Sequence, residues 1–116
     1  MKDLKISKEL FNEITNSKCH EVFIKNEFII AHSNLGMKMV NIYEFVFIKC
    51  KEWIIDKGYH ISTSEDKINN YIYLYKMIKN HLGYEIDKSK GVQFDSKGYI
   101  DNLLEACEWI LNEVNK

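Results

Sequence analysis

The chain has 116 residues, 46% of them hydrophobic and 28% charged, and a formal net charge of −1. This length and composition are typical of one ordinary globular domain and exclude a disordered chain. The sequence contains no arginine and no basic cluster. Sequence-specific DNA binding is therefore unexpected, because base readout favours bidentate arginine contacts. No apolar run is long enough to span a membrane, so no membrane contact is expected.

The cysteines and the N-terminus indicate a compartment. Cys19, Cys50 and Cys107 are too few and too scattered for a disulfide scaffold, and their odd number fits a reducing environment. The first residues lack the apolar segment of a secretory signal. We therefore expect a cytoplasmic protein.

The first half of the chain predicts a helix, a hairpin and a long helix. The expected elements are a helix after Ser7, strands over 19–25 and 27–32 around Asn26, a turn over 33–36 and a helix over 42–57. Asn41 and Glu44 have the spacing of a capping box, and Gly58 has the place of a helix-ending glycine.

The second half predicts strands followed by a last helix. A strand is expected over 59–63. Residues 68–78 fit a helical period, but Tyr71 to Tyr75 also alternate as the residues of a strand do and are strong β-formers, so a strand is favoured there. Residues 84–86 and 92–94 suggest a short hairpin around 88–91, and Ser96 is the expected cap of a helix over 97–114. Together the pattern predicts a single α+β domain over 1–116, with a short N-terminal helix and two long helices packed on a mostly antiparallel sheet of three to five strands.

The last helix has one continuous apolar side. On a helical wheel the apolar residues lie within roughly 60° of Cys107; they are Ile100, Leu103, Leu104, Ile110, Leu111 and Val114. Trp109 falls almost opposite, beside Glu105 and Asn112. An indole among polar residues on an outer face predicts a partner-binding surface there.

The first long helix is apolar on two sides. Trp53 shares the main stripe with Val46 and Cys50, which predicts a core position for this tryptophan. A second stripe holds Phe45, Ile48 and Ile55. The second stripe requires its own cover, which is the N-terminal helix, the loop after Ile78, a second subunit or a binding partner. We include its residues in the predicted partner-binding surface.

Two histidines raise the question of a metal site. His20 and His32 would face each other across the hairpin if its turn had three residues, and a two-residue turn would separate them. Glu21 points to the other face of its strand. No metal and no cofactor are expected. Cys50 and Cys107 lie on buried stripes, and no catalytic motif is present, so we predict that the chain is not an enzyme.

Three tyrosines alternate along the favoured strand. Tyr71, Tyr73 and Tyr75 would then share one sheet face, on which aromatic rings could stack nucleic-acid bases. Lys76 and Lys79 are close in sequence, but they form no basic stripe. A small nucleic-acid or nucleotide binder is therefore an alternative interpretation.

Two segments carry a family resemblance. Residues 41–59 hold a helix, a glycine and a returning strand, and residues 103–111 end a helix with Ala-Cys-Glu-Trp-Ile-Leu. This arrangement resembles small phage- or prophage-borne α/β sandwich proteins of unknown function, in which two helices cover a short antiparallel sheet. The resemblance implies a mobile-element origin in a bacterial host cell, and it brings no catalytic residues with it.

These observations lead to one functional hypothesis and two alternatives. The first is a non-catalytic protein-binding module of phage type, such as an inhibitor of a bacterial defence system or an immunity protein. Its partner would be another protein or a second copy of the chain. The alternatives are the tyrosine-face binder and a small enzyme with a site at His20 and His32.

Overall fold

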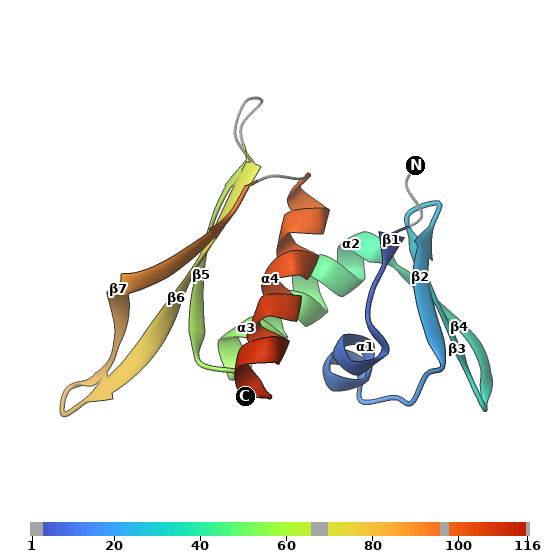
Figure 1. Ribbon diagram of the computed structural model, residues 1–116, viewed down its shortest axis with the longest axis horizontal. Coiled ribbons are helices and arrows are strands. Elements are labelled where there is room, and N and C mark those ends of the chain that lie inside the picture. Colours follow the sequence, from blue (N-terminus) through green and yellow to red (C-terminus); the bar gives the residue numbers. More distant parts are fainter. Residues whose placement is uncertain (1–3, 66–69, 96–97, 116) are drawn as a thin grey trace. The chain divides into compact units, whose positions relative to one another are not determined.

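The computed structural model describes residues 4–65, 70–95 and 98–115 and shows an α+β protein with antiparallel sheets (Figure 1). Two sheets are present, so the prediction of one sheet is wrong. Contacts within the chain divide it into two compact units, Met1–Cys50 and Lys51–Lys116. The expectation that residues 1–116 form a single domain stays a prediction.

The first unit contains a four-stranded sheet and a short helix. Its elements are β1 (Leu4–Lys5), α1 (Lys8–Thr15), β2 (Glu21–Lys25), β3 (Phe28–Ser33) and β4 (Gly36–Asn41), and the strand order is β1-β2-β3-β4. As expected, Ser7 caps α1 by accepting a hydrogen bond from the Leu10 N–H. Strand β4 was not predicted, because its sequence holds only one β-branched residue and it lies at the sheet edge.

The β2–β3 turn decides which side chains share a face. Lys25 pairs with Phe28, so the turn contains two residues, Asn26 and Glu27, whose φ angles are 49° and 67°. Positive φ at both central residues defines the type I′ hairpin turn, and asparagine tolerates it well. On the inner face of the sheet the side chains are buried, as are two residues of α1; these core residues are Val22, Ile24, Ile29, Ala31, Leu10 and Phe11.

The predicted long helix is formed by three consecutive segments. These are α2 (Ile42–Glu44), the π-helical η1 (Phe45–Cys50) and α3 (Lys51–Asp56). Asn41 Oδ1 accepts hydrogen bonds from the N–H groups of Tyr43 and Glu44 at 2.9 and 3.4 Å, which confirms the predicted cap. A π-helical turn takes in an extra residue and rotates later positions by roughly 100° relative to an α-helical wheel. Phe45, the first residue of η1, is buried, and Tyr43, which precedes η1, is exposed.

The second unit contains a three-stranded sheet covered by the last helix. Its elements are α3, β5 (Tyr59–Glu65), β6 (Asn70–Asn80), β7 (Gly83–Phe94) and α4 (Tyr99–Val114), and the strand order is β5-β6-β7. The favoured strand interpretation of 71–75 is confirmed. Helix α4 lies over the sheet face that buries Tyr59, Ile72, Leu74 and Phe94 (Figure 1).

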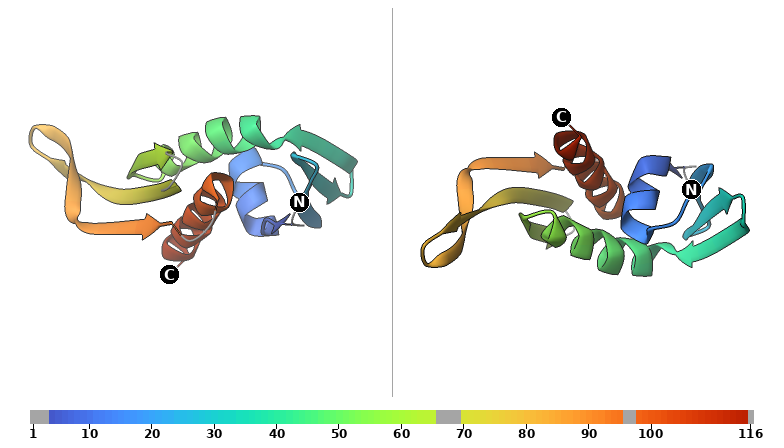
Figure 2. Two further views of the ribbon diagram at one scale, coloured as in Figure 1. Left: turned by 90° about the horizontal axis from the view of Figure 1, so that it is seen from above. Right: turned by 90° about the horizontal axis from the view of Figure 1, so that it is seen from below.

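The hairpin predicted around 88–91 is wrong. Residues 84–86 and 92–94 belong to one strand, β7, and the chain reverses at His81 and Leu82. There the Leu82 N–H donates to Asn80 Oδ1 at 2.8 Å. Strands β6 and β7 continue past β5 as a two-stranded ribbon (Figure 2).

Three expected positions lie outside the described residues. They are the predicted cap Ser96, the helix start at residue 97 and Ile68 of the helical alternative. In the described part, α4 begins at Tyr99, with Gly98 in the N-cap position.

Candidate interaction surface

Phe45 belongs to the core, which corrects its assignment to the partner-binding surface. Its side chain is 1% exposed, and its ring stacks on Phe11 of α1 with centroids 5.6 Å apart. The N-terminal helix therefore covers this part of the second stripe. Ile48 is 47% exposed and Ile55 is also exposed, so these two residues remain available to a partner.

Trp109 packs on the second sheet, which corrects its placement on an outer face. Its ring is half-buried and makes edge contacts with Tyr59 and Phe94, with centroids 6.0 and 6.4 Å apart. The wheel placed Trp109 opposite Cys107 correctly, but it does not say which side of α4 the sheet covers. The neighbouring Glu105 is half-buried and Asn112 is exposed.

The contacts of Trp109 change the expected effect of its removal. We expect Trp109→Ala to lower the free energy of unfolding by about 2–3 kcal/mol, less than for a fully buried tryptophan because part of the ring is in water. Urea unfolding measures this change, and Asn112→Ala on the same helix, expected within about 0.5 kcal/mol of the wild type, is the control. An unchanged midpoint for Trp109→Ala, together with weaker association, would restore Trp109 as a surface anchor.

His20 and His32 do not share a site. The two-residue turn pairs His32 with Glu21, and the His32 ring stacks on Phe23 with centroids 6.0 Å apart. His20 Nε2–H instead donates to Asn34 Oδ1, 2.5 Å away. The two imidazoles therefore lie in different surroundings. In the described part of the chain, no three His, Cys, Asp or Glu side chains gather as a metal site requires.

A cavity beside His20 contains the Cys19 thiol. Its volume is about 660 Å³, and the loop after α1 and the β3–β4 hairpin line it. The Cys19 N–H and thiol both donate to Asn12 Oδ1, at 3.1 and 3.4 Å. Burial raises the pKa of this thiol, against the opposing charge of Lys8. The raised pKa favours the protonated thiol, which is a poor nucleophile. Cys50 and Cys107 are buried, as expected.

The tyrosines share the outer face of the second sheet. The ring centroids of Tyr71 and Tyr73 are 5.0 Å apart, and those of Tyr73 and Tyr75 are 6.0 Å apart. All three side chains are half-buried. A Cβ at Gly91 would lie 2.6 Å from the Tyr75 ring, so the glycine leaves room for this tyrosine to lie on β7. Much of each ring is therefore already in contact with protein.

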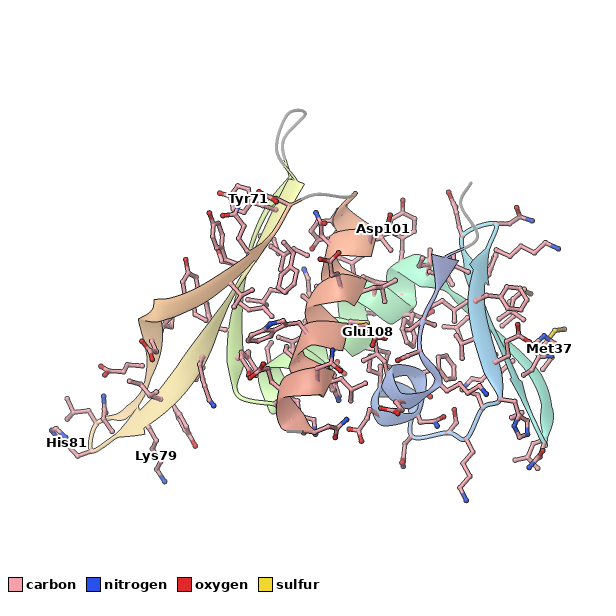
Figure 3. All side chains as sticks on the ribbon, viewed as in Figure 1. Met37, Tyr71, Lys79, His81, Asp101 and Glu108 are labelled. Atoms are coloured by element: carbon pink, nitrogen blue, oxygen red, sulfur yellow. The ribbon has the colours of Figure 1, made fainter. Side chains whose placement is uncertain are left out.

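The outer face of sheet β1–β4 presents several apolar side chains to water. Alternate residues of β2, β3 and β4 point away from the core. Across the strands the rows of this face are Glu21–His32–Met37, Phe23–Ile30–Met39 and Lys25–Phe28–Asn41. Met37 and Met39 are 66% and 61% exposed, Phe28 is exposed, and Phe23 and Ile30 are half-buried. Figure 3 shows the Met37 side chain beside the strands of this sheet.

The charges that β2 contributes to this outer face lie at its ends. Glu21 and Lys25 occupy opposite ends of β2, and both are exposed. Across β2, β3 and β4 the middle row, with Ile30 at its centre, is apolar, and Lys5 of β1 pairs with Phe23 at the edge of that row. A continuous apolar area bordered by polar groups is the usual composition of a protein-binding surface.

The comparisons with known proteins give no further guidance. No family model matches this chain, and no curated protein or solved structure is significantly similar to it. Among the described residues, no helix combines the length and the apolar character needed to cross a membrane.

Proposed function

We propose that the chain is a non-catalytic protein-binding module whose contact surface is the outer face of sheet β1–β4. The observation that carries this proposal is the exposure of Met37 and Met39 in a face that also holds Phe23, Phe28 and Ile30. Leaving such a face in water is unfavourable by about 25 cal/mol for each Å² of apolar surface, and a bound protein removes that cost.

The proposal includes a biological setting. A module of phage or mobile-element type, acting in the cytoplasm of a bacterial host, would inhibit a defence system or neutralise a toxin by covering one of its surfaces. Such an activity needs contact area and no catalytic group. The buried, protonated Cys19 and the separated His20 and His32 are consistent with it.

The tyrosine face supports a second candidate, a nucleic-acid or nucleotide binder. Tyr71, Tyr73 and Tyr75 lie in a row, with His60 beside Tyr75. Their contacts with one another and with β7 leave less ring area for a stacked base. Acidic residues also outnumber lysines in residues 51–116. Both features favour the protein-binding proposal over this one.

Site-specific photo-crosslinking separates these candidates. We expect a photoreactive phenylalanine analogue at Ile30 to form protein adducts in living bacterial cells. The matched position is Ser62, which is exposed and pairs with Tyr73 on the tyrosine face. Mass spectrometry of the irradiated samples identifies each adduct.

The two positions give distinct outcomes. Protein adducts at Ile30 in clear excess over Ser62 support the proposed function. Nucleic-acid adducts at Ser62, with none at Ile30, would favour the tyrosine face instead. Equal yields at the two positions would show that the apolar face of the first sheet attracts no partner.

A further inference from the structure

We infer that the partner of this outer face is a second copy of the chain, and that two copies pack these faces together around a two-fold axis. The inference rests on the proposed function, because it uses the same surface. The argument comes from charge. A face with an acid at one end and a base at the other is complementary to itself when a second copy is turned end for end.

The rows of the face define the arrangement. The axis runs across the strands through the Phe23–Ile30–Met39 row. It places Ile30 against Ile30 of the partner subunit at the centre. At the β1 edge it sets Lys5, which pairs with Phe23, opposite Lys5 of the partner subunit, a single like-charge pair against two ion pairs at the ends of the face. It also brings Glu21 next to Lys25 of the partner subunit, and the symmetry repeats this ion pair at the other end. The strands of the two sheets then run nearly antiparallel, with the sheets about 10 Å apart.

A second two-fold arrangement has no such complementarity. An axis parallel to the strands would turn β2 of one copy onto β4 of the other. Glu21 would then face a methionine, and Lys25 would face an asparagine. The charges at the ends of β2 therefore select the axis across the strands.

The size of the face sets the strength of the contact. The spacing between strands and the rise per residue give the three rows an area of roughly 300 Å² in the plane of the sheet on each copy. This is well below the roughly 800 Å² per partner of a standard stable interface. The dimer is therefore a weak, reversible one, which forms as the protein concentration rises.

Reversal of the charges tests this arrangement. Sedimentation velocity should show reversible dimerisation of the full chain between roughly 5 µM and 1 mM, the range of a weak interface. Glu21→Lys and Lys25→Glu should each raise the dimer Kd roughly tenfold, because each variant turns two attractive pairs into repulsive ones. The double variant, Glu21→Lys with Lys25→Glu, should restore the wild-type Kd.

One control and one further variant complete the design. Lys38→Glu changes an exposed charge of β4 on the other side of the sheet and should leave the Kd unchanged. Ile30→Lys should abolish the dimer. Circular dichroism of each variant verifies that it is folded.

Three results would overturn the inference: a wild-type chain that stays monomeric over the whole range, a double variant that fails to recover, or a Lys38→Glu effect as large as that of the other reversals. The crosslinking experiment distinguishes failure of this inference from failure of the proposed function. A monomeric chain that still forms Ile30 adducts with another protein keeps the binding surface and loses only the second copy.

Discussion

Replacing Trp53 with alanine is expected to lower the free energy of unfolding by about 3–5 kcal/mol. The side chain is 7% exposed, and the Lys57 Nζ lies 5.8 Å from the centre of its ring. Within the described residues the indole Nε1 has no hydrogen-bond partner, so burial of the ring accounts for its contribution. Urea unfolding followed by circular dichroism measures the change.

Two variants make the Trp53 test specific. Trp53→Phe keeps most of the buried aromatic area and should lower the free energy of unfolding by less than half as much as Trp53→Ala. Ile55→Ala removes an exposed side chain from the same helix, α3, and should stay within about 0.5 kcal/mol of the wild type. If Trp53→Ala and Ile55→Ala had the same midpoint, Trp53 would not be a core residue.

Phe45→Ala should destabilise the chain by about 3–5 kcal/mol, whereas Ile48→Ala should change its stability by less than about 0.5 kcal/mol. The two residues are three positions apart in η1, and both were predicted to contact a partner. The structure separates them: Phe45 is stacked on Phe11 and buried, and Ile48 is half in water. Thermal and urea unfolding of the two variants compare them directly. Equal losses would mean that Phe45 is no more a core residue than Ile48.

Much of the fold could be predicted from local signals. Runs rich in Val, Phe and Ile identified β2 and β3, and the alternation of Tyr71 to Tyr75 identified β6. The caps at Ser7 and Asn41 located two helix starts. All of these signals depend on neighbours in sequence. The π-helical turn could not be predicted, since no simple residue pattern marks it. The helical wheel put Phe45 on a second apolar stripe, but it did not say that α1 covers this residue.

The candidate surface required information that no single segment carries. Its rows depend on the register of β2, β3 and β4, and a change of one residue in the Asn26–Glu27 turn would pair β2 and β3 differently. The edge strand β4, with its exposed methionines, has a weak strand pattern. For Trp109, the helical wheel predicted its position around α4 correctly, but a single helix does not indicate which of its sides the sheet covers.

The central claim is that the outer face of sheet β1–β4 is where this chain contacts a second copy of itself. Methionine-methyl NMR tests it most directly, because the chain has four methionines and two of them, Met37 and Met39, lie on that face. Met77, on β6 in the other sheet, is an internal reference. As the protein concentration rises, the Met37 and Met39 methyl signals should shift together along one binding curve while Met77 stays constant. A shifting Met77 signal beside unchanged Met37 and Met39 would contradict the claim.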